Sequence, residues 1–236
     1  MGVPPELGAY QLCVFFLMGY LTAREDPENF PPNELPRIFQ QYERVFKDAL
    51  DALNLSHEAL RARPEFNFDP GDPASLESGI AVLRVVNALQ QKGYQRIALL
   101  GAEETTGADV VCYKDDQKIC CEVKAITKQS EGRKGFYLEN QVYEKVRENA
   151  VKARTQLKAT AVKLNCQRTT FAVVMNWSPH DKILGDNDLR NIVDKLDRDL
   201  SLGERDGLPL GLGEIDDVLF VMPTVTLISR RGDARA

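Results

Sequence analysis

An acid and a lysine share one face of a predicted strand within GADVVCYKDDQKICCEVKAI, residues 107–126. Side chains alternate between the two faces of a strand. The apolar face carries Ile119, Cys121, Val123 and Ala125, and the other face carries Lys118, Cys120, Glu122 and Lys124. The apolar face is predicted to meet the core. The charged face, with Asp109 nearby, is a set of groups that could hold a divalent cation.

The two apolar halves of this stretch predict a β-hairpin. A turn centred on Asp115 and Asp116 places Asp109 directly opposite Glu122. Directly opposed residues have Cβ atoms about 4.5–5.5 Å apart, and like charges at that separation repel. Lys124 lies on the same face and can compensate in part. A hard cation such as Mg²⁺ would compensate the repulsion more fully than Lys124, because it takes oxygen ligands from one or two carboxylates.

A simpler arrangement is that both acids lie at a solvent-exposed sheet edge, with Lys124 paired to one of them. For an isolated acid pair this arrangement is the more common one. The setting favours the metal site, however, because the hairpin lies between two helical segments and is followed by an apolar strand. Strands so placed are usually central in a sheet, where exposed acids are rare.

The elements around the hairpin follow from apolar spacing and from chain-breaking residues. In the segment 34–53, Ile38, Tyr42, Phe46 and Leu50 recur at helix spacing. Further helices are expected from Pro73 to just before Gly93 and over 139–162 and 186–200, and strands over 94–101, 171–177 and 217–228. Pro73 suits a first helical turn, Gly93 suits a helix end, and Pro223 suits an edge strand or a broken one.

Composition narrows the class of protein. The chain has 236 residues, 43% of them hydrophobic and 28% charged, which suits one large globular domain. Its five cysteines form no CxxC pair and it has two histidines, so zinc chemistry and a histidine-based triad are poorly supported and reduced thiols are expected. The apolar stretch 10–23 follows Glu6 without a basic leader, which predicts a buried helix and a cytoplasmic protein.

Charge is unevenly distributed along the chain. The net charge is −5, yet residues 124–168 hold 11 lysines and arginines against 4 acidic residues, a local net charge of +7. A basic segment inside an acidic protein suggests a local anion site. A solvated helix face explains the same pattern.

The hairpin and its setting resemble the PD-(D/E)xK nuclease superfamily, which has the restriction-endonuclease-like fold. The resemblance is carried by Gly107-Ala108-Asp109, a gap of twelve residues, and Glu122-Val123-Lys124. Ala108 stands where the motif has proline, at a position that varies widely. The resemblance covers roughly residues 72–178 and extends to the helices on either side. It implies an α/β fold whose central mixed sheet is flanked by helices, with residues 71–236 as the nuclease-like domain and 1–70 as an N-terminal helical extension.

By the same resemblance, Asp109, Glu122 and the Val123 carbonyl would bind Mg²⁺, for which Mn²⁺ can substitute. Lys124 would orient or deprotonate the attacking water, or stabilise charge on the phosphate. These residue types suit phosphodiester cleavage, because a metal between two carboxylates activates water and relieves charge on phosphate oxygens. Lysine can also act as a base when its pKa falls, which arginine cannot do.

Six further residues are weaker candidates. The resemblance implies that Glu77 adds an acid at the metal and that Gln141 adds a polar catalytic group. Lys128, Arg133, Lys134 and Lys145 would contact nucleic-acid phosphates. Each has an ordinary explanation as well: a helix-start acid for Glu77, plain helix surface for Gln141 and Lys145, and a basic loop for the rest.

The function implied is a Mg²⁺-dependent endonuclease acting on DNA, with no membrane partner and with a homodimer left open. The alternative is a catalytically inactive nuclease-fold module that binds nucleic acid or protein, which the acidic bulk of the chain favours a little. A sugar-cleaving carboxylate pair is a weaker third candidate, because the hairpin has only Tyr113 to stack on a sugar.

Overall fold

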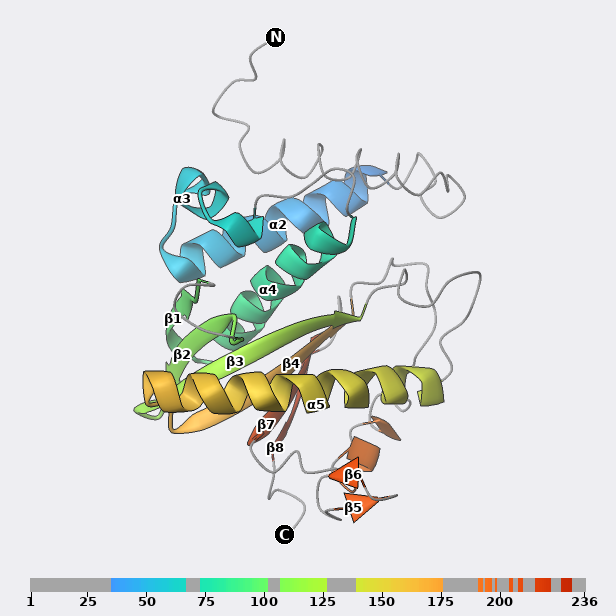
Figure 1. Cartoon of the computed structure of the whole chain (residues 1–236). Helices are drawn as coiled ribbons and strands as arrows, with labels where there is room; N and C mark the ends of the chain where they lie inside the picture. Colours follow the sequence, from blue (N-terminus) through green and yellow to red (C-terminus); the bar gives the residue numbers. More distant parts are fainter. Residues whose placement is uncertain are drawn as a thin grey trace.

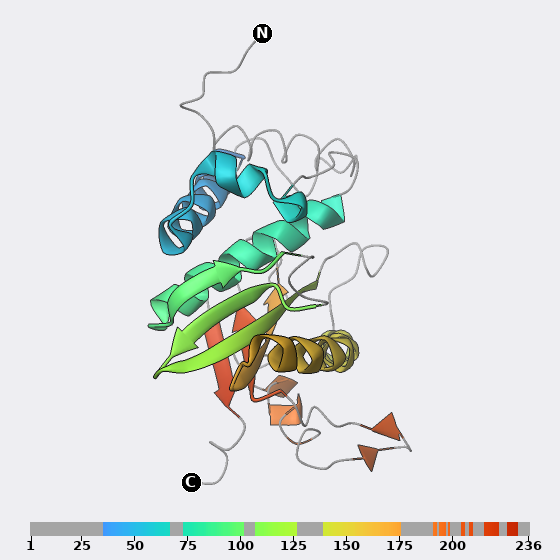
Figure 2. The ribbon, with the colours of Figure 1, turned by 60° about the vertical axis from the view of Figure 1, so that its left-hand side comes forward.

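A mixed sheet of six strands forms the middle layer of the computed structural model (Figures 1 and 2). The strand order is β1-β2-β3-β4-β7-β8. The bounds are Gln95–Leu99 (β1), Val110–Lys114 (β2), Gln117–Ile126 (β3), Arg168–Met175 (β4), Asp217–Val221 (β7) and Thr226–Arg230 (β8). β3 pairs antiparallel with β2 and parallel with β4, which makes it an interior strand, as predicted.

The structure describes residues 35–66, 73–101, 107–126, 139–175, 215–221 and 226–230, with short pieces between 191 and 209. The apolar stretch 10–23, the basic loop residues Lys128, Arg133 and Lys134, and the domain boundary predicted at residue 70 lie outside these ranges. No helix in the described ranges is long and apolar enough to cross a membrane.

Helices cover both faces of the sheet, which confirms the predicted α/β class. α4 (Pro73–Gln91) lies on one face with α2 (Leu35–Leu53) packed behind it, and α5 (Glu139–Leu164) lies on the other (Figures 1 and 2). The smaller elements are α3 (His57–Arg61), the 3₁₀ turn η2 (Pro64–Phe66) and a two-stranded ribbon of β5 (Glu204–Arg205) and β6 (Leu208–Pro209).

Each face of the sheet has its own apolar core. On the α4 side, Phe46, Leu83 and Leu89 pack with Val110 and Cys121. On the α5 side, Tyr143, Val146 and Leu157 pack with Cys120, Phe171 and Phe220. Adjacent cysteines therefore point to opposite faces, as strand alternation requires. The four described cysteines are free thiols, as predicted.

The end of α4 confirms the helix end predicted at Gly93 and shows its physical cause. Gly93 adopts a φ of +79°, a left-handed conformation that glycine tolerates best. The Tyr94 amide donates to the Leu89 carbonyl at 3.0 Å and the Gly93 amide to the Gln90 carbonyl at 2.9 Å. These two bonds form a Schellman cap and turn the chain directly into β1.

The segment 217–228 contains two antiparallel strands, β7 and β8, with Pro223 between them, which agrees with the broken strand predicted at this proline. Two features differ from the predictions. β4 begins at Arg168 rather than at residue 171, because Thr169 and Thr170 are buried in the ladder although they are polar. α3 and η2 were not predicted, because elements of five and three residues are too short for a periodic pattern.

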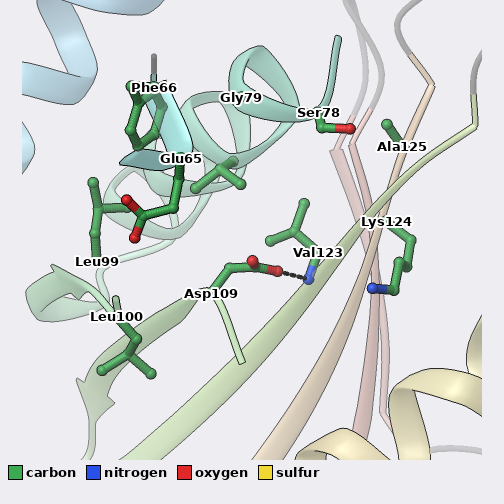
Figure 3. A pocket seen from close by; sticks show the side chains of 11 residues that line it. Glu65, Phe66, Ser78, Gly79, Leu99, Leu100, Asp109, Val123, Lys124 and Ala125 are labelled. Carbon is green, nitrogen blue, oxygen red and sulfur yellow. Dashed lines mark hydrogen bonds between the residues drawn. The ribbon is translucent and has the colours of Figure 1, made fainter. Parts of the chain in front are cut away.

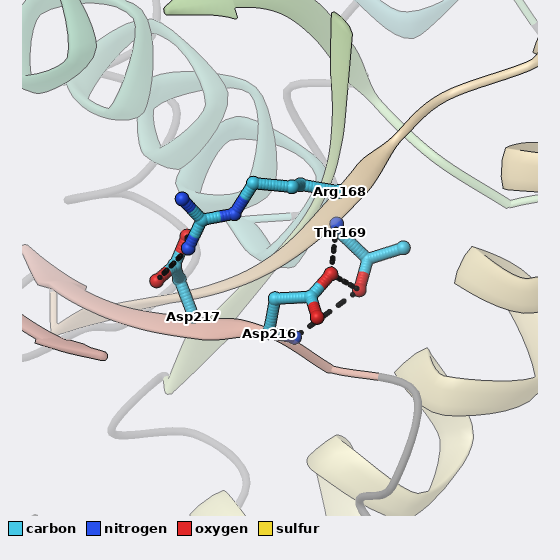
Figure 4. A network of polar contacts seen from close by, with 4 residues as sticks. All are labelled: Arg168, Thr169, Asp216 and Asp217. Carbon is cyan, nitrogen blue, oxygen red and sulfur yellow. Dashed lines mark hydrogen bonds and ion pairs between the residues drawn. The ribbon is translucent and has the colours of Figure 1, made fainter. Parts of the chain in front are cut away.

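A polar network joins β4 to β7 where both strands begin (Figure 4). The Arg168 Nη2 atom lies 2.8 Å from both Oδ1 and Oδ2 of Asp217. Next to this pair, the Thr169 amide donates to the Asp216 carboxylate at 2.9 Å. Asp217 is only 2% exposed, so its charge depends on this arginine and fixes the register of the two strands.

We therefore expect Arg168→Met to lower the free energy of unfolding by about 3 kcal/mol, because it leaves a buried carboxylate without its cation. Urea denaturation measures this. The matched control is Arg147→Met, which breaks the exposed pair with Glu144 on α5 and should cost less than about 0.5 kcal/mol. Equal losses in the two variants would show that the β4–β7 network does not stabilise the sheet.

Candidate metal centre

The β2–β3 hairpin has the predicted register. Val110 pairs with Cys121 and Lys114 with Gln117, and Asp115 and Asp116 form the turn with φ values of +51° and +60°. Positive φ at both central residues is the geometry of a type I′ turn, which suits the twist of a hairpin. One step beyond the ladder, Asp109 lies opposite Glu122.

Asp109 is held at the end of β2 by its backbone and its side chain. Its amide donates to the Cys121 carbonyl at 3.0 Å, and its carbonyl accepts from the Leu100 amide at 2.8 Å. Its Oδ2 atom accepts a 2.7 Å hydrogen bond from the Val123 amide (Figure 3). The Asp109 carboxylate thus takes the place of the backbone partner that the Val123 amide of β3 would otherwise have on β2. This hydrogen bond fixes the carboxylate against β3.

Glu122 is buried beside Asp109, with 1% of its surface exposed. Its Oε1 atom forms an ion pair with Lys124 Nζ. Its Oε2 atom is buried and has no hydrogen-bond donor among the described residues. Ionised carboxylates only accept hydrogen bonds, so Asp109 cannot satisfy this oxygen while both acids are charged.

The alternative of two acids at a solvent-exposed sheet edge does not agree with the structure. Cys120 and Glu122 are both buried on the face that α5 covers, whereas Lys118 and Lys124 at the two ends of this face remain partly exposed. The acids are therefore not a solvated edge pair. Their charges lie in a region where water stabilises them poorly, which makes a compensating cation more valuable.

Burial dominates the protonation of both acids. It raises the pKa of Glu122 to about 8, and the charge of Asp109 adds to this rise, while Lys124 opposes it. Burial raises the pKa of Asp109 to about 6, against the lowering effects of the Val123 amide and Lys124. Without a metal, the pair therefore retains a proton at neutral pH instead of carrying two charges.

Oxygen atoms of the right kind for a hard cation converge here. The carboxylates of Asp109 and Glu122 lie on adjoining strands, and Oε2 of Glu122 lacks a donor. The amide and carbonyl of one residue point to the same side of a strand, so the Val123 carbonyl faces Asp109 as its amide does. Mg²⁺ commonly binds one or two carboxylates and completes its shell with water, and this donor set fits that habit.

The described residues contain no cluster of three or more histidine, cysteine, aspartate or glutamate side chains that could hold a metal. A site at Asp109 and Glu122 therefore depends on two carboxylates, a backbone carbonyl and water. This composition suits Mg²⁺ or Mn²⁺ and does not suit zinc, which prefers a full set of nitrogen and sulfur ligands in structural sites.

A cavity of about 290 Å³ opens next to Asp109 on the α4 side of β3 (Figure 3). We call it the Asp109 cavity. Its lining residues come from η2, α4, β3 and the segment around the end of β1: Glu65, Phe66, Ser78, Gly79, Val82, Leu99, Leu100, Asp109, Val123, Lys124 and Ala125. Asp109 and Lys124 belong both to the cavity and to the carboxylate site, so a ligand in one reaches the other.

The weaker candidates are placed unevenly. Glu77 lies in α4 directly before Ser78 and Gly79 of the cavity lining, and Gln141 lies in the first turn of α5, but both side chains fall outside the described residues. Lys145 is half-buried on α5, 3.4 Å from Glu148, and does not line the cavity. These three roles stay predictions.

Glu65 lines the cavity although no sequence pattern pointed to it. In Figure 3 its carboxylate lies beside Leu99, on the same side of the cavity as Phe66, and its charge adds to the raised pKa of Asp109. Glu65 lies in a three-residue 3₁₀ turn within a stretch rich in proline, which carries no periodic signal. Only the folded chain brings this turn to the hairpin.

Gly107 lets the segment with Asp109 approach α5 closely. A Cβ atom at this position would overlap the side chain of Gln156 and lie 3.0 Å from its Cα. Any side chain at residue 107 must therefore push the Asp109 segment and α5 apart. No other residue type fits without such a movement.

Comparison of the chain with protein-family models, curated proteins and solved structures gives no match.

The metal-free protein is expected to lose stability as the pH rises. The unfolded Glu122 carboxyl ionises near 4.5, whereas the folded one keeps its proton up to about pH 8. Its favourable contribution is therefore complete below pH 4.5 and is lost progressively towards pH 8. We expect Glu122→Gln to raise the melting temperature in chelator by roughly 5 °C at pH 8, and by much less at pH 4.5.

The matched control is Glu148→Gln, which neutralises an exposed glutamate on α5. It should change the melting temperature by similar small amounts at both pH values. A Glu122→Gln shift that does not depend on pH would contradict the protonated pair.

Gly107→Ala is expected to lower the free energy of unfolding by about 2 kcal/mol, because it overpacks the contact with α5. Gln156→Gly removes the opposing side chain at the usual cost of a helical glycine, about 1 kcal/mol. The double variant should therefore be more stable than the sum of the two losses predicts, by at least about 1 kcal/mol in urea denaturation. Strictly additive losses would show that the two residues do not collide.

Proposed function

We propose that this chain is a Mg²⁺-dependent nuclease of the PD-(D/E)xK superfamily that cleaves DNA as an endonuclease. The observation that carries the proposal is the pair of half-buried Asp109 and buried Glu122 across the β2–β3 hairpin. One oxygen of Glu122 has no donor among the described residues, and Lys124 lies beside it. The interior position of the strand supports it as well, because an acid buried there without a partner destabilises the fold.

The residues divide the chemistry between them. Asp109, Glu122 and the Val123 carbonyl would hold the metal, which supplies charge neutralisation at the phosphate and a more acidic bound water. Asp109 is kept in place by the Val123 amide, so its orientation does not depend on the ligand. The hairpin thus provides a preformed oxygen cradle instead of one that must assemble around the ion.

Lys124 is suited to act on phosphate or water. Its side chain is 29% exposed and its ammonium group pairs with Glu122, so it stands between the buried acids and the cavity. As an ammonium it can donate to a phosphate oxygen. As a neutral amine it can accept a proton from the attacking water, which an arginine at this position could not do.

The experiment is metal-dependent cleavage by the full-length protein. We expect Mg²⁺ or Mn²⁺ to support cutting of DNA, and we expect Asp109→Asn, Glu122→Gln and Lys124→Met each to lower kcat/KM by at least about 100-fold. The same ions should raise the melting temperature of the parent, and this shift should disappear in Asp109→Asn. Lys152→Met, at an exposed position of α5 outside the cavity, is the matched lysine control and should keep most of the activity.

Two results would contradict the proposal in different ways. If the variants cut DNA as well as the parent, Asp109, Glu122 and Lys124 do not form the catalytic site. A parent that shows no melting shift at millimolar Mg²⁺ or Mn²⁺ and no cleavage of DNA or RNA would favour the inactive binding module, which the acidic net charge of −5 also allows.

A further inference from the structure

The Asp109 cavity is lined by both polar and apolar side chains. Its polar residues are Asp109, Lys124, Glu65 and Ser78. Apart from Gly79, the other lining residues have apolar side chains and come from separate elements: Phe66, Val82, Leu99, Leu100, Val123 and Ala125. Phe66 and Leu99 are 5% and 8% exposed, so these walls belong to the folded core and are not a loose surface patch.

The charges of this lining favour a neutral group over a phosphate in the body of the cavity. Two of its residues, Glu65 and Asp109, are acids, and Glu65 is paired with Arg63 at 3.4 Å. Lys124 is the one cation among the described lining residues, and it is already paired with Glu122. An anion inside would meet acids and hydrocarbon, whereas a neutral aromatic group would meet apolar side chains of matching character.

The volume sets the size of the occupant. About 290 Å³ lies at the lower end of ligand cavities, which is room for one planar heterocycle or a nucleoside and not for a stacked base pair. Because Asp109 is shared with the carboxylate site, a group in the cavity is attached close to any phosphate bound there. A base can reach such a cavity only when it is unpaired or has left the helical stack.

We propose that the Asp109 cavity binds the unpaired base next to the phosphate that is cut, so that the enzyme acts on single-stranded DNA or on unpaired segments within a duplex. This inference rests on the proposed nuclease function and names the substrate class of the same site. The apolar walls take the base, and the carboxylate end takes the sugar-phosphate that follows it.

The test compares one labelled oligonucleotide in three forms with the full-length protein and Mn²⁺: single-stranded, fully paired, and single-stranded with one base removed next to the cleavage position. The intact single strand should be cut roughly tenfold faster than the duplex and than the form that lacks the base. Equal rates for all three, still dependent on Asp109 and Lys124, would overturn the base cavity and leave the nuclease proposal standing.

Ser78→Trp provides the second variant, because Ser78 is an exposed α4 residue on the cavity lining and a large side chain there would occupy the cavity. It should lower kcat/KM for the intact single strand roughly tenfold and leave the form that lacks the base almost unchanged. Gln90→Trp, at an exposed α4 position outside the cavity, should affect neither. An equal loss on both substrates in Ser78→Trp would mean a structural defect and would overturn the inference.

If the parent protein cuts none of the three substrates, their binding affinities measured with Ca²⁺ still test whether the cavity binds a base. Tighter binding of the intact strand than of the form that lacks one base, with this difference lost in Ser78→Trp, would support the cavity and overturn the nuclease. Equal affinities would overturn both.

Discussion

The structure depends on two acids held side by side, one buried in β3 and one half-buried directly before β2. Glu122 lies inside the sheet at 1% exposure, and Asp109 is held against the same strand by the Val123 amide. Two charges in this position repel each other and are poorly hydrated. The pair therefore keeps a proton, which is why burial raises both pKa values, or it takes up a cation. A purely hydrophobic core would require neither a retained proton nor a bound cation.

The surrounding fold keeps the two acids close together although their charges repel each other. β3 is fixed by the hairpin on one side and by eight residues paired with β4 on the other, with Glu122 opposite Phe171. α5 covers Glu122, and the close approach at Gly107 sets how near the Asp109 segment lies to that helix. At the start of β4, the Arg168–Asp217 pair fixes the register of the next strand. The two acids are thus held by elements that strand pairing, helix packing and the Arg168–Asp217 pair already stabilise.

The hairpin could be predicted from the sequence because its information is local. Strand alternation and the position of the Asp115-Asp116 turn are enough to set the register, and a register determines which residues face each other. The helices α2 and α4 were found for the same kind of reason, since their apolar spacing and the Pro73 and Gly93 signals lie within the elements themselves.

The depth of Glu122 and the role of Glu65 could not be predicted, because both depend on distant parts of the chain. The setting of the hairpin predicts an interior strand, but the nearly complete burial of Glu122 also requires α5 to cover this face, and α5 begins only at residue 139. Glu65 lies more than forty residues before Asp109, in a turn without periodicity, and only the packing of η2 beside α4 brings it to the cavity. Resemblance to a family pointed to Glu77 for an acid from this region, whereas the described acid that reaches the cavity is Glu65.

The position of Asp109 explains how one hairpin can serve two kinds of chemistry. Glu122 lies on the α5 face of β3, while the cavity opens on the α4 face, where Val123 and Leu99 form part of its wall. Lys124 pairs with Glu122 and also lines the cavity. Asp109 stands at the strand end, where β2 no longer separates the two faces, and it contributes to both. A nucleotide has the same division, with a charged phosphate next to a neutral base. Under the proposed function, a nucleotide would lie across the end of β2, with its phosphate at the carboxylates and its base against the apolar side chains of the cavity. The point where the hairpin ladder stops would then hold both parts of the proposed substrate.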